Sequence, residues 1–471
     1  MGSEWKTVCI DQIKSPQKYS CVGGPFGSSL SRKHYVDSGV PVIRGVNLSG
    51  DIFSESEFVF VSPEKSQELQ RNMAFRGDLV FTQRGTLGQV ALIPENSDYE
   101  CYVVSQSQMK LTVDPTKADP YFIYSYFRSK EAKTVIEKSA IVGGVPHINL
   151  GILKDFKLRL PSLSVQQAVS KIAKDFDRKM LLNNQINQTL EQMAQTLFKS
   201  WFVDYDPVID NALDVGNPIP EVFETRVERR KAVRESADFK PLPDDVRQLF
   251  PSEFEESELG WVPKGWDTKS IKDFGKVVTG KTPPKKIEDA YGDKGVPFIT
   301  PTDIDKDVYV IGTKRFLTEA GVEVVKKNLL PKSSICVTCI GSQMGKAVIA
   351  PTMSISNQQI NSVITKKEHE RIFLFLNLRS RREEIFLVGS SGSTMPIINK
   401  STFEKLPVLV PGDAILKFFD SEVAPLLNRI HSSSLESKTL STIRDTLLPK
   451  LISGELRLDS PEVEQAKALV D

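Results

Sequence analysis

Two kinds of hydrophobic pattern alternate along this chain of 471 residues. Short β-branched runs such as "VPVIRGV", "DLVFTQ", "QVALIP" and "CYVVSQS" are separated by Gly and Pro turns, a pattern typical of a β-rich core. Residues 119–138 place apolar side chains at helical spacing and predict one amphipathic helix. We expect its aromatic side chains at positions 122, 126 and 127 in a core.

Two longer stripes predict helices over residues 164–203 and 412–455. In the first stripe, Val169, Phe176, Leu190 and Leu197 recur at multiples of seven, and Lys179 and Asn183 interrupt its middle. A helix of about 35 residues spans roughly 50 Å, which is longer than a small domain needs. One alternative is that each stripe packs on its own domain and on nothing else. Two unpartnered stripes in one chain instead favour a spacer in which they pack on each other. The expected spacer positions are Ile172, Phe176, Ile186, Leu190, Met193, Leu197, Leu426, Ile430, Leu440, Ile443 and Leu447.

The two segments that precede the stripes are similar in sequence to each other. "EWKTVCIDQI" (4–13) has a counterpart in "GWDTKSIKDF" (265–274), and "GVPVIRGVNLS" (39–49) matches "GVPFITPTDID" (295–305). "VPHINLGILKDFKLRLP" (145–161) matches "MPIINKSTFEKLPVLVP" (395–411), which aligns Asn149 with Asn399. Since the order and spacing are kept, the sequence predicts two copies of one domain with an approximate internal twofold.

The charge of the chain is divided unevenly. Residues 204–260 hold 7 Lys and Arg against 15 Asp and Glu, a net charge of −8, while the whole chain carries +1, so the remainder carries +9. Six prolines in this segment favour an acidic linker that wraps over a surface. The basic remainder permits a nucleic-acid partner. The predicted order is a first domain (1–163), a first helix (164–203), the linker (204–260), a second domain (261–411), a second helix (412–455) and a tail (456–471).

Several classes of protein do not fit this composition. No run of 18 apolar residues predicts a membrane span, and "MGSEWKTVCI" is not a secretory signal, so we expect a cytoplasmic protein. Five cysteines at irregular spacing argue against a disulfide framework. Cys336 and Cys339 form a C-x-x-C within a β-like apolar run, without a second ligand pair nearby, and we interpret them as buried thiols and not as a zinc or redox site.

One stretch satisfies the phosphate-loop pattern G-x-x-x-x-G-K-[ST] through Gly275, Gly280, Lys281 and Thr282. The other copy has "CVGGPFGSSL" at this place, and two prolines follow Thr282 at once, where a working loop would begin a helix. We interpret the match as chance and expect Lys281, Lys285 and Lys286 to form a basic loop against a phosphate backbone. Other catalytic motifs are absent from the sequence, which favours a binding protein over an enzyme.

The duplicated opening "GWDTKSIKDF…VVTGKTP", the segment "GVPFITPTDI" and the closing "VPHINLGILKDFKLRLP" resemble the DNA-specificity subunit of type I restriction-modification systems. The junction "TLFKSWFVDYDP" and the phrase "LFPSEFEESELGWVPKGW" extend the resemblance over nearly the whole chain. It implies an α+β fold with two β-rich target-recognition domains, separated by two long antiparallel helices with a pseudo-twofold. Each domain would read one half of a split double-stranded DNA target, with the half-sites about 34–36 Å apart.

The resemblance also implies partners. The helices would dock methyltransferase subunits, two of them, which carry S-adenosylmethionine and methylate adenine. Restriction subunits in the same complex would bring ATP, Mg²⁺ and DNA cleavage. This chain itself would hold no cofactor, no metal and no catalytic residue, and it would have no membrane partner.

Base reading needs Arg, Lys, amide or hydroxyl side chains in polar loops. Each candidate is as well explained by a solvated loop residue as by a DNA contact, and we expect Gly85, Gly88, Gly341 and Gly345 to form turns. A protein-binding scaffold with degenerate recognition domains, and a nucleotide-dependent enzyme built around Lys281, remain the alternatives. Besides the three lysines of the basic loop, the candidates are Arg44, Asn47, Gln83, Arg84, Gln89, Gln106, Gln108 and Lys110 in the first domain, and Thr300, Thr302, Gln343, Lys346, Asn357, Gln358, Gln359 and Asn361 in the second.

Overall fold

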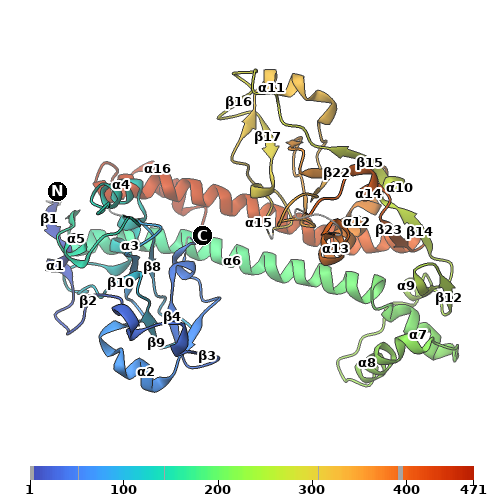
Figure 1. The fold of residues 1–471 in the computed structure, drawn as a ribbon, viewed down its shortest axis with the longest axis horizontal. Coiled ribbons are helices and arrows are strands. Elements are labelled where there is room, and N and C mark those ends of the chain that lie inside the picture. Colours follow the sequence, from blue (N-terminus) through green and yellow to red (C-terminus); the bar gives the residue numbers. More distant parts are fainter. Residues whose placement is uncertain (1–4, 51, 143, 306, 391–395, 471) are drawn as a thin grey trace. The chain divides into compact units, whose positions relative to one another are not determined.

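The computed structural model describes residues 5–470 except 51, 143, 306 and 391–395. The chain divides into two compact units, Met1–Leu182 with Ser437–Asp471, and Asn183–Glu436 (Figure 1). We call them the first and the second unit. Within the described ranges, no helix is both long and apolar enough to cross a bilayer.

The first unit contains three sheets. A parallel pair, β4 with β9, lies inside the largest sheet, and the other strand pairs are antiparallel. The five-stranded sheet has the order β3 (Tyr35–Val36), β5 (Val59–Val61), β4 (Val40–Ile43), β9 (Cys101–Val104) and β6 (Met73–Phe75). The four-stranded sheet has the order β2 (Cys21–Gly23), β10 (Gln108–Leu111), β7 (Leu79–Thr82) and β8 (Val90–Leu92), and β1 (Lys6–Cys9) pairs with β11 (Lys157–Leu160).

The second unit repeats this plan. A four-stranded sheet has the order β15 (Gly275–Thr279), β22 (Ile360–Thr365), β19 (Ile335–Thr338) and β20 (Ala347–Ile349). A second sheet has the order β16 (Tyr291–Gly292), β18 (Phe316–Leu317), β17 (Val296–Ile299) and β21 (Ile355–Ser356), and β17 pairs in parallel with β21. β14 (Asp267–Ser270) pairs with β23 (Pro407–Val410), as β1 does with β11. The duplication that the sequence predicts is therefore confirmed by strand order and direction.

Equivalent residues also make equivalent local contacts in the two repeats. Asn149 caps helix α5 (Leu150–Lys154) by accepting a 2.9 Å hydrogen bond from the Ile152 amide. Asn399 caps helix α14 (Lys400–Glu404) with the same 2.9 Å bond from the Thr402 amide. A short polar side chain at this position satisfies a backbone donor that the helix itself leaves open, which explains the matched asparagines.

The single helix that we predicted over residues 119–138 is wrong in one respect, since the segment forms two helices. α3 (Pro120–Arg128) ends at Ser129, which has extended backbone angles and caps α4 (Lys130–Lys138) through a bond from the Ala132 amide. A serine that caps a new helix competes with continuation of the old one. Phe122 and Phe127 are fully buried, as expected of core residues. The second repeat has the corresponding pair α12 (Arg371–Ser380) and α13 (Arg382–Ser390).

Shorter helices join these elements. Each has only four to six residues, too few to be stable alone, so these helices depend on tertiary packing. They are α1 (Ile10–Ile13) and α2 (Pro63–Glu68) in the first unit, and α10 (Ile271–Phe274) and α11 (Glu319–Val324) in the second.

Two long helices, α6 (Leu163–Phe202) and α15 (Asp413–Ser453), each contribute to both units. In the first unit, Ile172 and Phe176 of α6 lie in one core with Leu440 and Leu447 of α15. In the second unit, the core joins Phe198 to Phe419, whose ring centroids are 6.2 Å apart. The two helices thus pack on each other within each unit, as the spacer prediction requires. At 40 and 41 residues, each spans about 60 Å.

The apolar stripe on α6 differs from the predicted one near its C-terminal half. Met193 is 52% exposed, and Leu190 and Leu197 are half-buried. The fully packed positions there are Ala194 and Phe198. An α-helix turns once every 3.6 residues, so a strict seven-residue spacing drifts around a straight helix and loses the packed face.

Polar side chains interrupt the helix pair at two levels. In the second unit, the buried Asn183 side chain donates to Glu436 Oε2 at 2.9 Å, and Asn187 donates to Ser434 Oγ at 3.0 Å. In the first unit, Arg444 Nη1 lies 2.6 Å from Asp177 Oδ1, and both side chains are buried. Each polar group therefore has a partner where the two helices meet.

The segments assigned to an acidic linker and a tail contain regular structure. Residues 204–260 form α7 (Asp206–Val215), α8 (Glu224–Arg234), α9 (Asp244–Arg247) and the hairpin of β12 (Phe254–Ser257) with β13 (Gly260–Pro263). The tail contains α16 (Pro461–Lys467), and its Val463 and Ala466 are buried in the core of the first unit.

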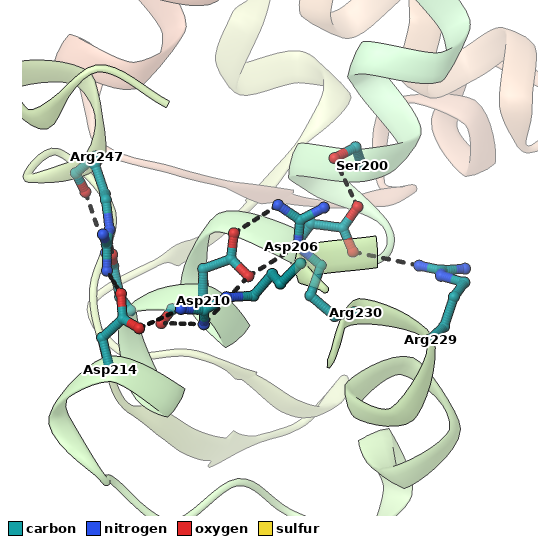
Figure 2. A network of polar contacts seen from close by, with 9 residues as sticks. Ser200, Asp206, Asp210, Asp214, Arg229, Arg230 and Arg247 are labelled. Carbon is teal, nitrogen blue, oxygen red and sulfur yellow. Dashed lines mark hydrogen bonds and ion pairs between the residues drawn. The ribbon is translucent and has the colours of Figure 1, made fainter. Parts of the chain in front are cut away.

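No residue of α8 is buried. We therefore attribute the docking of α8 to ion pairs with α7 and the residues just before it. Arg230 binds Asp210 through two hydrogen bonds of 2.8 and 2.6 Å, while Arg229 lies 2.9 Å from Asp204. Figure 2 shows Arg230 with Asp210 and Arg229 with Asp206, which also accepts a bond from Ser200 near the end of α6. Burial alone would raise the pKa of Asp204, but its ion pairs with Lys199 and Arg229 outweigh that effect and lower the pKa.

We expect Asp210→Asn to loosen α8 selectively. The substitution removes a charged, mostly buried partner of Arg230, and hydrogen bonds to charged groups contribute about 1.5–3 kcal/mol. Hydrogen exchange of the α8 amides should therefore be faster in the variant than in the wild type. Exchange should become faster still when the salt concentration rises from 0.1 to 1 M, because the Debye length falls from about 10 to about 3 Å and the remaining ion pairs are screened. Glu228→Gln on the exposed face of α8 is the matched control. Equal exchange in both variants at both salt concentrations would contradict ionic docking.

Candidate nucleic-acid interface

An open cleft of about 870 Å³ in the first unit gathers polar side chains from four separate segments. These are the loop before β3, the turn after β4, the β7–β8 hairpin and the turn between β9 and β10. The lining residues are Gly27, Leu30, Ser31, Arg32, Tyr35, Arg44, Gly45, Val46, Ser49, Thr82, Arg84, Gly85, Thr86, Gln89, Ser105, Gln106, Ser107 and Gln108.

The cleft is basic. It contains Arg32, Arg44 and Arg84, and none of the described residues that line it is acidic. The Arg84 side chain is exposed and makes no hydrogen bond or ion pair with any described residue. An acid-free concave surface with three guanidinium groups attracts a polyanion.

Arg44 is held in place by the turn that follows β4. Its amide donates to Asn47 Oδ1 at 2.8 Å, which starts the short 3₁₀-helix Gly45–Leu48. Its Nη2 donates to the Glu57 carbonyl at 2.6 Å, while its Nε is buried without a partner in the described part of the chain. A fixed guanidinium with donor capacity to spare suits a ligand that supplies acceptor atoms.

Glutamine side chains in the cleft are also braced. Thr82 Oγ1 donates to Gln89 Oε1 at 3.1 Å, and Gln106 Nε2 donates to the Leu30 carbonyl at 2.7 Å. Gln108 Oε1 accepts from Ser105 Oγ. The Nε2 group of Gln89 donates to no described residue, so this amide keeps its donors for a ligand. Such preset amides lose little conformational freedom when they bind.

In each repeat a glycine lies close to a turn that carries amide side chains. We call this turn the amide turn; it comprises residues 105–108 in the first repeat and 357–359 in the second. A Cβ added at Gly24 would lie 2.0 Å from the Ser105 carbonyl oxygen, and one at Gly280 would lie 2.1 Å from that of Asn357. The Gly24 amide donates to the Gln108 carbonyl at 2.8 Å, and the Gly280 amide to that of Ile360 at 3.0 Å. Both sites therefore require glycine for the same close approach.

The turns of the β7–β8 and β19–β20 hairpins are built alike. Gly85, Gly88, Gly341 and Gly345 all have positive φ, between +81° and +101°, as expected of turn residues. Thr82 donates its amide to the Gln89 carbonyl at 3.0 Å, and Thr338 to that of Lys346 at 2.9 Å. These contacts make Lys346 the positional equivalent of Gln89.

Other equivalent positions also carry different chemistry. The turn after β17 matches the turn after β4, with Thr300 at the place of Arg44, and its amide donates to Asp303 Oδ2 at 2.8 Å. The backbone of Arg84 forms an isolated antiparallel β-bridge with that of His147, and the backbone of Ile340 forms the matching β-bridge with that of Ile397. The second repeat thus keeps the backbone of the first and replaces two of its arginines.

Comparison with known proteins agrees with this duplicated plan. The family model described as "Type I restriction modification DNA specificity domain" matches residues 25–192 and 263–432. The chain belongs to this family. Within it, the chain is 33% identical over 404 residues to the type I restriction enzyme HindI specificity subunit of Haemophilus influenzae, covering 81% of this chain and 87% of that protein.

Two further relatives cover nearly the whole chain. The type I restriction enzyme MjaIX specificity subunit of Methanocaldococcus jannaschii is 24% identical, over 95% of this chain and 94% of its own. A crystal structure of the type I restriction-modification S subunit of M. genitalium shares the fold, with a TM-score of 0.55 and 14% identity over 96% of both chains. The α+β fold with two recognition domains and a helical spacer, predicted from the sequence, is therefore confirmed.

Three of the predicted DNA-contact residues of the first repeat do not line the cleft. Asn47 is fully buried and donates to the carbonyls of Ser54 and Ser56, so it holds a loop. Lys110 is buried in β10 with its Nζ 3.1 Å from Asp78 Oδ2. Gln83 is half-buried, with its Oε1 facing Gly23. The polar atoms of Asn47 and Lys110 are used inside the fold, so we leave these two residues out of the proposed reading surface.

In the second repeat, several candidates meet near one another. Thr282 Oγ1 donates to Gln358 Oε1 at 2.7 Å, and the Lys281 amide donates to the Ser356 carbonyl at 2.8 Å, which joins the basic loop to the amide turn. Lys346 Nζ lies 3.5 Å from Asp305 Oδ1, beside the turn that contains Thr300 and the exposed Thr302. Gln343, Lys285 and Lys286 are exposed, and Gln359 is half-buried.

Three candidates of the second repeat are buried. Thr300 donates its hydroxyl to Asp303 at 2.6 Å, and Asn361 accepts a 2.7 Å bond from Thr279 within the sheet. Asn357 is 8% exposed and donates to Gln359 Oε1 at 3.0 Å. Thr300 and Asn361 are left out of the proposed reading surface for the same reason as Asn47 and Lys110.

The structure does not support a phosphate loop at Lys281. Strand β15 ends at Thr279, and no helix begins in the described residues that follow it, up to Pro301. The helix N-terminus that would receive phosphates is therefore missing from this place.

The C-x-x-C cysteines behave as buried thiols. Cys336 and Cys339 are 0% and 2% exposed, and burial raises the pKa of each to about 11. Within the described ranges, no group of His, Cys, Asp and Glu could hold a metal ion.

The cleft contains residues that the sequence did not single out, above all Arg32, Thr86 and Val46. Arg32 belongs to the polar stretch "SRKH" and Thr86 to the "RGTLG" turn, so both could have been found as polar loop residues. Val46 is 44% exposed beside Arg44, and an exposed apolar residue in a polar loop is itself a signal.

Proposed function

We propose that this chain is the DNA-reading subunit of a type I restriction-modification complex and has no catalytic site of its own. Each repeat reads one half of a split double-stranded target. The observation that carries the proposal is the acid-free cleft of the first repeat, where three arginines and the accessible amides of Gln89 and Gln106 converge from four segments.

The cleft chemistry fits base edges as well as phosphates. An arginine pairs with guanine O6 and N7, an amide pairs with adenine N6 and N7, and an apolar side chain contacts the thymine methyl group. Arg44, Arg84, Gln89 and Val46 supply these three kinds of contact. Arg32 and the exposed lysines 281, 285 and 286 suit phosphate contacts, which position the duplex without reading it.

The two repeats are expected to read different half-sites. Thr300, Ile340 and Lys346 stand where the first repeat has Arg44, Arg84 and Gln89, so donors and charges differ while the backbone is kept. Gln358, Gln359 and Asn357 form the amide turn of the second repeat and are its candidate readers, together with Thr302 and Gln343.

The partners follow from family membership. We propose that the helix pair of α6 and α15 docks two methyltransferase subunits, which carry S-adenosylmethionine and modify adenine. Restriction subunits join through the same complex and supply ATP and Mg²⁺. The name of the H. influenzae relative, a restriction enzyme specificity subunit, supports this assignment.

The test is a map of methylated adenines on DNA treated with the full chain, its methyltransferase partner and S-adenosylmethionine. Wild type should give a split motif, and exchange of residues 265–411 for those of a relative should change one half only. Arg84→Ala should relax the other half and weaken specific binding about 5- to 150-fold, the equivalent of the roughly 1–3 kcal/mol of one bidentate base contact.

Arg71→Ala is the matched control, because Arg71 is an exposed arginine of the same unit outside the cleft. It should leave the motif unchanged. An unchanged motif in Arg44→Ala, Arg84→Ala and Gln89→Ala alike would overturn base reading by the cleft. The absence of any motif in an intact complex would instead favour a protein-binding scaffold.

A further inference from the structure

A second pocket of about 360 Å³ lies in the first unit, between the α3–α4 junction and the C-terminal part of α15. It shares no lining residue with the reading cleft. Cationic side chains dominate its walls: Arg128, Lys130 and Lys133 from one side and Arg444 from the other. The stem of Lys133 rests on Gly88 of the β7–β8 hairpin, since a Cβ added there would lie 3.2 Å from Lys133 Cγ.

The two arginines have internal counter-charges and the two lysines do not. Arg128 and Arg444 share Asp177, at 2.9 and 2.6 Å, and Arg444 also lies 2.8 Å from Asp445. Both lysines are exposed, and neither forms an ion pair with a described residue. Two arginines balanced by two aspartates leave a charge of +2 from the lysines, which suits a dianion.

Two kinds of hydrogen-bond donor face the same space. Ser125 is 5% exposed, lines the pocket, and its Oγ has no hydrogen-bond partner in the described part of the chain. A buried hydroxyl without a partner is costly, so it indicates a missing partner. The pocket also contains the start of the nine-residue helix α4, and the first N–H groups of a helix have no acceptor within it. The Ala132 amide donates to Ser129, which leaves the amides of Lys130 and Glu131 for a ligand.

We propose that this pocket binds a phosphate group, either as the dianion of a free ion or monoester or as a singly charged phosphodiester of the DNA backbone. Lys130 and Lys133 neutralise the charge, and Ser125 and the α4 amides donate to its oxygens. The site is separate from base reading and does not depend on it.

The second repeat lacks this site for a structural reason. Its Ala194 and Leu427 are the equivalents of Arg444 and Asp177, at a constant offset of 250 residues, and both are buried in an apolar core. The α12–α13 junction has Arg379 at the place of Arg128, and Arg379 pairs with Glu191 at 2.5 Å. The phosphate pocket therefore distinguishes one half of the duplicated chain from the other.

The experiment compares thermal unfolding of the full chain in sodium phosphate and in sodium chloride of equal ionic strength, with isothermal titration of inorganic phosphate alongside. The variants are Lys130→Ala/Lys133→Ala and Ser125→Ala, and Lys138→Ala on the exposed end of α4 is the control. Phosphate at about nine times its dissociation constant should shift the folding equilibrium of the wild type and the control about tenfold. The double variant should lose this shift.

Ser125→Ala has a signature that general destabilisation cannot mimic. Without phosphate it should raise the melting temperature, because it removes a buried hydroxyl without a partner. With phosphate it should show a smaller shift than the wild type. Equal phosphate shifts in all four proteins, or no heat of phosphate binding to the wild type, would overturn the proposal.

A competition experiment identifies the source of the phosphate. If inorganic phosphate weakens binding of a random-sequence duplex by the wild type more than by the double variant, at constant ionic strength, the pocket holds a backbone phosphate. If phosphate binds the wild type and the duplex affinity is the same for both proteins, the pocket holds a free ion or monoester. Both outcomes support a phosphate site.

Discussion

Arg444→Ala should destabilise the first unit by about 3–5 kcal/mol, the usual cost of breaking a buried ion pair from one side. The Arg444 side chain is 3% exposed and lies 2.6 Å from Asp177, whose side chain is 7% exposed. Removal of the guanidinium leaves the carboxylate with Arg128 and the Tyr121 hydroxyl, which donates to it at 2.6 Å. Because a chain of two units need not unfold in one transition, the measurement is peptide-resolved hydrogen exchange along α6 and α15.

The repeat itself supplies the control for this prediction. Asp177→Leu combined with Arg444→Ala installs the residues that the second repeat has at the same positions, Leu427 and Ala194. This pair removes the buried carboxylate together with Arg444, so no carboxylate is left with only part of its counter-charge, and it should cost less than Arg444→Ala alone. A double variant that loses as much as the sum of the two single variants would contradict coupling between the two side chains.

Gly24→Ala and Gly280→Ala should each abolish reading by one repeat and leave the other repeat intact. An added Cβ would lie 2.0 or 2.1 Å from a carbonyl oxygen of the amide turn, so the turn must move by more than 1 Å. Overpacking of this kind costs about 1–3 kcal/mol, and here it also displaces the Gln106 or Gln358 side chain. The measurement is the methylation motif, in which the half-site assigned to the altered repeat should become degenerate.

Gly45→Ala is the matched control in the first repeat. Its added Cβ would lie 3.9 Å from Gln108 Nε2, an ordinary contact, although Gly45 lines the same cleft. It should therefore keep the motif. Loss of the same half-site in Gly24→Ala and Gly45→Ala would indicate that any side chain added to the cleft blocks DNA, and it would remove the backbone approach as the explanation.

Local signals account for the parts of the fold that the sequence predicted well. Asn149 and Asn399 each cap the helix that begins at the next residue, by accepting a bond from the amide three positions on. Gly85 and Gly341 adopt turn angles that other residues avoid. The long helices follow from apolar spacing within one segment. The break at Ser129 was missed because serine is compatible with a helix interior and becomes a cap only when the following turn packs elsewhere.

The composition of the site depended on contacts between distant segments. Arg44, Arg84 and Gln106 meet because β4 pairs in parallel with β9, and β7 pairs with β10. Asn47 and Lys110 carry an amide and a positive charge, as the cleft residues Gln89 and Arg84 do. Their partners Ser54 and Asp78 nevertheless hold them in the interior. A polar loop residue looks the same in sequence whether its partner is a ligand or the protein itself.

The sequence by itself determined the duplication, the two long helices, the family and the absence of a credible phosphate loop, because each of these is written in one segment or in the comparison of two. The tertiary structure alone decided which polar side chains share a cleft, which are buried, and that Ser125 faces a pocket without a partner. The physical reason is that burial and hydrogen-bond pairing depend on neighbours far apart in the chain, whereas helix, turn and cap preferences depend on residues within a few positions.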